Sequence, residues 1–397
     1  MSFFSRACLL LIAVAFSTPA WGGEGLESGI SRLAGGGAVM AADQDGRILV
    51  AHNTDRALVP ASILKIFTAA AALEVLGPEY RFETVISRTP QGDLVLSGRG
   101  DPLLVSEEIR RLVRRLRYMG LDEVRSILVD AGYFQEGLVL HGTNCSLNPY
   151  DAYNGALCAN FNTAKIKVTG DGRVVPAESQ TPLTPIAKRA ASGSRVKGEA
   201  RINLAGSPEV CPLYAGELVR AFLEREGVKV SGGVRRARGE LDGAEPWYVH
   251  RSGWTMEDLV RKMFRYSNNF MANQIFLTMG AERFGPPATA EKARSVMQEY
   301  LEGIGITGLH VEEGSGLSRR TRVTAGHVIR VLEVFRPHRD LMECRQGACY
   351  KTGTLRDVKS LAGYLEGGAS FVIMLNGGSA DYQRRDKLFA VLRDWIG

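Results

Sequence analysis

Ser62 and Lys65 stand three positions apart, a spacing that could support nucleophilic chemistry. On a helix, residues three apart share one face, so the hydroxyl and the amine would be neighbours. A serine hydroxyl is a weak nucleophile unless an adjacent base removes its proton. A lysine in an apolar environment loses affinity for its proton and can act as that base. The pair therefore predicts acyl transfer by a serine whose general base is a lysine.

A second pattern, Ser267-Asn268-Asn269, could supply further polar groups to such a site. It is set within an apolar stretch that reads as helical, so its polar side chains predict a cleft lined by Ser267 and Asn269. The Ser267 hydroxyl could relay a proton to a leaving group, and the Asn269 amide could hold a substrate carbonyl. On its own, this pattern is equally compatible with a polar cap or an inter-helix hydrogen bond.

A third pattern, Lys351-Thr352-Gly353, occurs once in the chain, in a segment that reads as a strand. A cation and a hydroxyl beside a glycine suit an extended peptide lying along a strand edge. Lys351 would attract a substrate carboxylate, and the Thr352 hydroxyl would hydrogen-bond to it. The backbone N–H groups of Thr354 and Ser62 are candidates for an oxyanion hole. The alternative is an edge strand whose lysine serves only to prevent pairing with another chain.

The letters of these patterns are not sufficient to identify a site. A second Ser-x-x-Lys begins at Ser194 and a second Ser-x-Asn begins at Ser146. Ser194 lies in a polar, glycine-flanked stretch, which is typical of a loop or a strand edge. Ser62 instead opens an apolar run that follows a proline and ends at Leu76 before Gly-Pro, which predicts a buried helix. The order and the context of the three patterns therefore favour the site at Ser62.

Taken together, the three patterns resemble the penicillin-binding protein and serine β-lactamase superfamily. The specific resemblance is to the class C low-molecular-mass penicillin-binding proteins, the D-Ala-D-Ala carboxypeptidases and endopeptidases. It runs from about Ala38 to the C-terminus, and further stretches support it: GRGDP at 98–102, GSGLSR at 314–319 and SLAGY at 360–364. Glu313 stands where this group usually has aspartate.

The resemblance implies a serine-type D-Ala-D-Ala carboxypeptidase or endopeptidase that acts on peptidoglycan stem peptides without a cofactor. Ser62 would attack the penultimate D-Ala carbonyl, Lys65 would take the proton of Ser62, and Ser267 would protonate the leaving nitrogen. β-Lactams would acylate Ser62 because they mimic the same dipeptide end. The implied substrate-binding residues are Asn269, Arg319, Lys351, Thr352, Gly353 and Thr354, with Arg319 gripping a stem-peptide carboxylate.

Three other functions stay open at this point. A β-lactamase-like hydrolase would need a fast deacylation base, and no motif identifies one. A non-catalytic peptidoglycan-binding scaffold would not be labelled at Ser62, although the motif side chains are all present. A Ser-His-Asp hydrolase is disfavoured because the sequence contains no G-x-S-x-G elbow.

The predicted fold class is α/β, an antiparallel sheet flanked by helices, like that of penicillin-binding proteins and β-lactamases. Residues 38–43 and 47–52 predict one hairpin, 360–366 and 370–376 predict another, and 382–396 predicts a closing helix. Strands from both ends of the chain in one sheet would bring Ser62 beside Lys351.

An inserted accessory region should lie between the first and second motifs. We assign residues 23–84 and 246–397 to the catalytic domain and residues 85–245 to the insertion. Within the insertion, 107–118 predicts a helix, and the predicted strands are 126–130, 165–175, 194–204 and 228–238.

The N-terminus predicts export. Arg6 precedes an apolar run too short to span a bilayer and then small residues, the pattern of a Sec-type signal peptide over residues 1–22. The mature protein should therefore be periplasmic or otherwise extracytoplasmic. The net charge of +6 for the full chain becomes +5 once Arg6 leaves with the signal peptide. Because the protein is expected to be exported, we do not expect nucleic acid to be its partner. Five arginines between 110 and 117 predict a solvated helix face or a weak contact with anionic cell-wall polymer or a phospholipid surface.

Beyond Cys8 in the signal peptide, the chain has five cysteines: Cys145, Cys158, Cys211, Cys344 and Cys349. In an oxidising compartment, an odd number leaves at least one free thiol or an intermolecular bond. The spacing suggests Cys344–Cys349 and Cys145–Cys158 pairs, although sequence does not fix connectivity. No Cys/His spacing resembles a zinc site, so no metal is expected.

Overall fold

The computed structural model describes residues 23–397, apart from 145, 195, 205–206, 238–240 and 242. The predicted signal peptide, residues 1–22, lies outside the described residues. Across the described residues, none of the helices has the length and apolar character needed to cross a bilayer.

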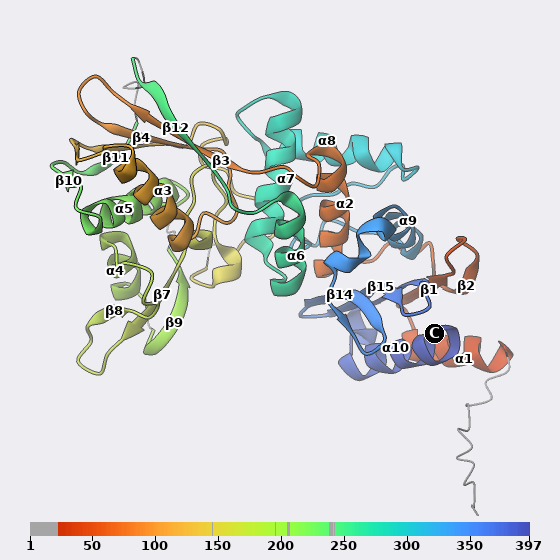
Figure 1. Cartoon of the computed structure of the whole chain (residues 1–397). Helices are drawn as coiled ribbons and strands as arrows, with labels where there is room; N and C mark the ends of the chain where they lie inside the picture. Colours follow the sequence, from red (N-terminus) through yellow and green to blue (C-terminus); the bar gives the residue numbers. More distant parts are fainter. Residues whose placement is uncertain (1–22, 145, 195, 205–206, 238–240, 242) are drawn as a thin grey trace, which may run out of the picture.

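One antiparallel sheet of six strands joins the two ends of the chain (Figure 1). Its order is β13-β14-β15-β16-β1-β2. Ala38 on β1 lies opposite Met374 on β16, so the first strands are paired directly with the last ones. This confirms the predicted fold class and both predicted hairpins. The strands are β1 Ala38–Ala42, β2 Ile48–His52, β13 Cys344–Arg345, β14 Ala348–Leu355, β15 Val358–Leu365 and β16 Ser370–Asn376.

Helices cover both faces of this sheet because its side chains alternate between two apolar clusters. Val39 and Ala41 pack with the two terminal helices, α1 (Gly23–Ala34) and α10 (Tyr382–Ile396). Ala38 and Met40 face the larger core. The helices of that core are α2 Lys65–Val75, α6 Met256–Tyr266, α7 Asn269–Phe284, α8 Ala290–Gly303 and α9 Ala325–Phe335.

The inserted region has its own core, on a sheet of order β11-β6-β4-β3-β12 (Figure 1). Its strands are β3 Glu83–Arg88, β4 Leu94–Gly98, β6 Ile127–Asp130, β11 Val234–Arg236 and β12 Glu245–Arg251. This sheet extends past the predicted limits of the insertion, residues 85–245, because β3 begins at Glu83 and β12 ends at Arg251. The other elements are α3 Ser106–Tyr118, β5 Glu123–Val124, β7 Thr163–Val168, β8 Val174–Pro176, α4 Pro185–Ser192, β9 Gly198–Asn203, α5 Val210–Arg225 and β10 Lys229–Val230.

Two predictions of single strands were wrong. Residues 165–175 form part of a hairpin of β7 and β8, because a turn closes between them with the Thr169 N–H bonded to the Arg173 carbonyl at 2.9 Å. Gly172 adopts φ +80° in this turn, a conformation that glycine reaches without strain. The predicted strand 228–238 is likewise replaced by two strands, β10 and β11, which join different sheets, and its last residue lies outside the described residues.

Candidate active site

Ser62 lies on a 3₁₀ turn, Ala61–Leu64, which leads directly into α2. Ala61 has φ +51°, an uncommon conformation for a residue with a side chain. Two glycines allow other segments to approach this turn. A Cβ on Gly316 would overlap the Ala61 carbonyl oxygen, and a Cβ on Gly353 would lie 2.7 Å from the Pro60 carbonyl oxygen and 3.1 Å from the Ser62 nitrogen. Gly353 therefore allows β14 to lie against the backbone of Ser62.

The Lys65 amine is fully buried and joins three parts of the site. Its Nζ lies 3.1 Å from the Ser62 hydroxyl, 2.8 Å from Asn269 Oδ1 and 2.7 Å from the Ser315 carbonyl oxygen. Burial, aided by the positive charge of Lys351, lowers the pKa of Lys65 to about 7, against an opposing effect of Glu313. A neutral amine is thus accessible near neutral pH, as a general base requires.

The second motif is the junction of α6 and α7. Ser267 ends α6 in a left-handed conformation, with φ +48°, and Asn268 caps α7 by accepting the Met271 N–H at 3.0 Å. This sharp break places Asn269 at the first position of α7, where its amide reaches Lys65. Ser267 is partly exposed, and its hydroxyl has no hydrogen-bond partner among the described residues.

The third motif lies on β14. Lys351 is only 4% exposed, and its Nζ donates to the Thr352 carbonyl at 3.0 Å. Burial lowers the pKa of Lys351 to about 8, while the charge of Glu343 raises it and that of Arg345 lowers it. The amine is therefore largely charged at neutral pH and can attract a carboxylate.

The backbone that follows Lys351 presents N–H donors on the side of β14 that faces away from β15. The Thr352 carbonyl accepts from Lys351 Nζ and so points away from β15. Because backbone groups alternate along a strand, the Thr354 N–H points the same way. The Ser62 nitrogen lies against Gly353, as described above. The structure thus brings Ser62, Lys65, Asn269 and the third motif together.

The loop that follows Glu313 contributes a contact to the site that the sequence did not predict. The buried Glu313 carboxylate accepts the N–H groups of Ser315, Gly316 and Ser318 at 2.8, 2.7 and 3.2 Å. It also accepts the Ser315 hydroxyl at 2.5 Å. These bonds fix the Ser315 carbonyl that binds Lys65. The GSGLSR stretch and the acidic residue before it indicated that this loop matters, but they gave no sign that its backbone binds Lys65.

Arg319 lies at the end of the same loop and is exposed. Its guanidinium forms an ion pair of 2.6 Å with Asp357, which precedes β15. The structure therefore places Arg319 beside the turn between β14 and β15. Its predicted contact with a stem-peptide carboxylate stays a prediction.

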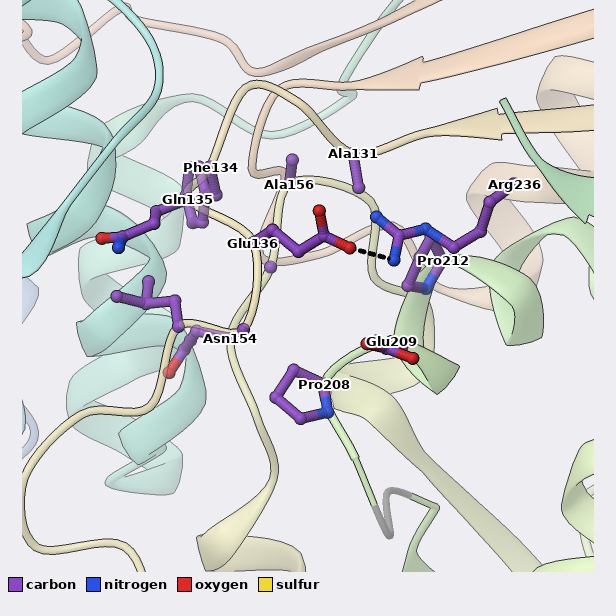
Figure 2. A pocket seen from close by; sticks show the side chains of 13 residues that line it. Ala131, Phe134, Gln135, Glu136, Asn154, Ala156, Pro208, Glu209, Pro212 and Arg236 are labelled. Carbon is purple, nitrogen blue, oxygen red and sulfur yellow. Dashed lines mark hydrogen bonds and ion pairs between the residues drawn. The ribbon is translucent and has the colours of Figure 1, made fainter. Parts of the chain in front are cut away.

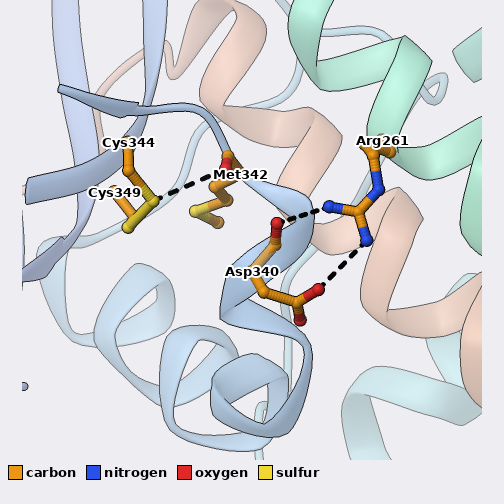
Figure 3. The surroundings of a disulfide bond; sticks show 5 residues. All are labelled: Arg261, Asp340, Met342, Cys344 and Cys349. Carbon is orange, nitrogen blue, oxygen red and sulfur yellow. Dashed lines mark hydrogen bonds and ion pairs between the residues drawn. A yellow bond between two sulfur atoms is a disulfide. The ribbon is translucent and has the colours of Figure 1, made fainter.

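The Cys344–Cys349 disulfide is confirmed and closes the hairpin of β13 and β14, two residues before Lys351 (Figure 3). The suggested Cys145–Cys158 disulfide was wrong, because Cys158 is not disulfide-bonded. Cys158 is a buried free thiol in contact with Cys211, another free thiol, and Cys145 lies outside the described residues. Their hydrogen bond and burial raise the pKa of Cys211.

A separate cavity of about 30 Å³ lies between the 131–138 loop and the start of α5 (Figure 2). An ion pair of 2.5 Å joins Glu136 and Arg236 at its wall. The cavity has room for roughly one water molecule, and none of its lining residues belongs to the three motifs. Within the described part of the chain, His, Cys, Asp and Glu side chains form no cluster of three or more that could hold a metal.

Comparison with known proteins agrees with this geometry. Residues 30–346 match the D-Ala-D-Ala carboxypeptidase 3 (S13) family. The D-alanyl-D-alanine carboxypeptidase of Actinomadura sp. (strain R39) is 29% identical over 441 residues, covering 91% of this chain and 81% of that protein. D-alanyl-D-alanine carboxypeptidase DacB of Haemophilus influenzae is 26% identical, covering 93% and 91%.

The fold is similar to the crystal structure of penicillin binding protein 4 (dacB) from Haemophilus influenzae. That comparison has a TM-score of 0.74 at 20% identity and covers 92% of this chain and 99% of the other. The family match spans well over half of the sequence and includes the first two motifs. The chain therefore belongs to the D-Ala-D-Ala carboxypeptidase 3 (S13) family of serine peptidases.

Proposed function

We propose that this serine-type D-Ala-D-Ala carboxypeptidase and endopeptidase acts on peptidoglycan stem peptides through an acyl-enzyme on Ser62. Lys65 takes the proton of Ser62 as Oγ bonds to the carbonyl carbon of the penultimate D-Ala. The carbon–nitrogen bond then breaks, and the proton passes through Ser267 to the leaving nitrogen. Water next attacks the ester, and Ser62 leaves with a proton. The hydrogen bond from Lys65 to Ser62 is the observation that carries this assignment.

The other motif residues would hold the peptide in an orientation that favours attack. Lys351 and the Thr352 hydroxyl, in the middle of β14, would bind the terminal carboxylate, and Asn269 would bind the acyl amide. The N–H groups of Ser62 and Thr354 would stabilise the oxyanion. These donors sit on a strand and a helix start rather than on free loops, which fixes their geometry before the substrate arrives.

β-Lactams should acylate the same serine. The Haemophilus influenzae penicillin binding protein 4 has been crystallised in complex with a β-lactam, and that structure resembles this chain with a TM-score of 0.67. A β-lactam presents a strained amide beside a carboxylate, which the arrangement of Ser62 and Lys351 would accept. Slow release of the acyl group would make the drug an inhibitor.

We also propose that the enzyme works outside the cytoplasm, on the cell wall, with residues 85–245 as an accessory region. The arginine-rich helix α3 could add a weak contact with anionic wall polymer or a phospholipid surface. Several of its arginines are already engaged: Arg111 pairs with Glu108 at 2.5 Å and Arg114 with Glu226 at 2.9 Å. This contact would therefore be secondary to recognition at the cleft.

Intact-mass labelling with a penicillin tests the proposal. The wild-type protein should gain the mass of one penicillin, and Ser62→Ala should gain none. Ser194→Ala removes the serine of the other Ser-x-x-Lys pattern and should be labelled like wild type. Labelling of Ser62→Ala at the wild-type rate would overturn the assignment. Digestion of purified cell wall, followed by mass analysis of the muropeptides, would then separate carboxypeptidase from endopeptidase products.

A further inference from the structure

The inserted region reaches the active site through the loop of residues 131–142, which follows β6. Near the start of this loop, the Gln135 N–H donates to the carbonyl of Ala288, just before α8, at 2.8 Å. Further along, Leu138 and Leu140 are buried in the larger core, the one that contains α2 and α7. The loop is therefore anchored beside the active site by its own hydrogen bonds and apolar contacts.

The end of the 131–142 loop contacts the loop that follows Glu313. His141 Nδ1 lies 2.7 Å from the Ser318 hydroxyl oxygen. The next residue, Gly142, has φ +102°, and a Cβ on it would lie 2.8 Å from the Ser318 nitrogen. Glycine is thus required at this position both by the backbone conformation and by the close approach of the two loops.

The Ser318 hydroxyl needs an acceptor, and His141 supplies one. Ser318 is completely buried, and its hydroxyl oxygen already accepts the Arg320 N–H at 3.2 Å. The hydrogen of a buried hydroxyl has to be donated to a protein group or to an ordered water. We therefore assign the hydroxyl as the donor and His141 Nδ1 as the acceptor. His141 itself is exposed, so its replacement leaves no cavity in a core.

A continuous series of hydrogen bonds joins Ser318 to the general base. The Ser318 N–H donates to the Glu313 carboxylate at 3.2 Å, and the same carboxylate accepts the Ser315 N–H at 2.8 Å. The Ser315 carbonyl in turn accepts from Lys65 Nζ at 2.7 Å. A displacement of Ser318 would therefore alter the bonds that hold Ser315 against Lys65.

We propose that His141 is a positioning residue of the active site: through its hydrogen bond to Ser318, the inserted region holds the loop that orients Lys65. This inference rests on the function proposed above. The Glu313 bonds restrain the loop from within, whereas His141 restrains it from a segment that is anchored separately in the core. Because His141 acts through Ser318, we expect it to favour the acylation step rather than the initial binding of the ligand.

Saturation kinetics of acylation by a penicillin test this role, because they separate the limiting acylation rate from the half-saturating concentration. His141→Ala should lower the limiting rate by roughly 2- to 10-fold, which corresponds to one hydrogen bond, and should leave the half-saturating concentration nearly unchanged. His141→Asn should recover most of the rate, because its amide oxygen can accept the same hydroxyl hydrogen. The melting temperatures of both variants should stay close to that of the wild-type protein, since position 141 is exposed.

Two glycine variants provide a matched comparison within the same loop. Gly142→Ala forces a Cβ against the Ser318 backbone and should slow acylation at least as much as His141→Ala. Gly137 also has a positive φ, +70°, but a Cβ on it would meet no atom within 4 Å, so Gly137→Ala should react like wild type.

Three results would overturn the inference: a wild-type limiting rate in His141→Ala, no recovery in His141→Asn, or equal slowing by the two glycine variants. The last result would mean that backbone strain anywhere in the loop, and not contact with Ser318, controls the rate. Absence of any labelling of the wild-type protein would instead overturn the proposed function, so the two failures are distinguishable.

Discussion

Lys65 and Lys351 are two buried lysines of one cleft that must be in opposite charge states for the proposed reaction. Lys65 must be neutral to accept the proton of Ser62, and Lys351 must be charged to bind a carboxylate. Burial lowers the pKa of both, to about 7 for Lys65 and about 8 for Lys351. The positive charge of Lys351 helps to lower the pKa of Lys65. In the proposed reaction, the group that binds the carboxylate would thus also favour the neutral form of the base.

These two values predict a bell-shaped pH dependence for acylation. The rate should rise as pH passes about 7, because Lys65 loses its proton, and fall as pH passes about 8, because Lys351 loses its charge. The second-order rate of penicillin acylation, measured between roughly pH 5.5 and 9.5 at constant ionic strength, checks both limbs. An acylation rate that keeps rising above about pH 8 would show that the charge of Lys351 is not required.

At the scale of elements, the loop after Glu313 is held by a buried carboxylate rather than by regular secondary structure. Glu313→Gln would place an amide N–H₂ among N–H donors and leave at least one of them unsatisfied. We expect a loss of about 2–4 kcal/mol in the free energy of unfolding. Acylation should also slow, because the Ser315 carbonyl would no longer be fixed against Lys65.

Urea unfolding and penicillin labelling measure the two effects of Glu313→Gln. Glu312→Gln is the matched control, since Glu312 is only partly buried and makes only long contacts, with Arg294 at 3.5 Å and His310 at 3.4 Å. That change should cost less than about 1 kcal/mol. Equal unfolding midpoints for the two variants would contradict the structural role of Glu313.

Elements whose signals lie within one short stretch of sequence could be predicted. The helix that follows Ser62, the two hairpins and α10 were each indicated by their apolar patterns and turn residues. The turn between β7 and β8 was missed because a polar, glycine-containing segment was read as a continuous strand. The contact of Ser315 with Lys65 joins residues 250 positions apart in the chain. No local pattern encodes it, and the same holds for the contact of Cys158 with Cys211.

At the scale of the whole molecule, one buried side chain on α7 ties the inserted region to the catalytic core. Gln274 donates to the carbonyls of Gly100 and Gly155 at 2.9 and 3.0 Å. Its own oxygen accepts from the Asn154 amide and from the Gly155 N–H, at 3.0 and 3.1 Å. Because Gln274 lies five residues after Asn269, the helix that carries the second motif is also the one that holds the insertion.

Gln274→Leu should therefore weaken the joint between the two parts while leaving the motif side chains in place. It keeps a similar volume but removes the partners of several buried polar groups, which should cost about 3 kcal/mol. We expect a lower melting temperature and faster protease cleavage within residues 85–245 than within the six-stranded sheet. Gln298→Leu is the control and should change neither, because the Gln298 amide donates to Glu302 of the same helix, α8, at 2.7 Å. If both variants resist protease like wild type, the insertion is held by its apolar contacts with the core, and Gln274 contributes little to the joint.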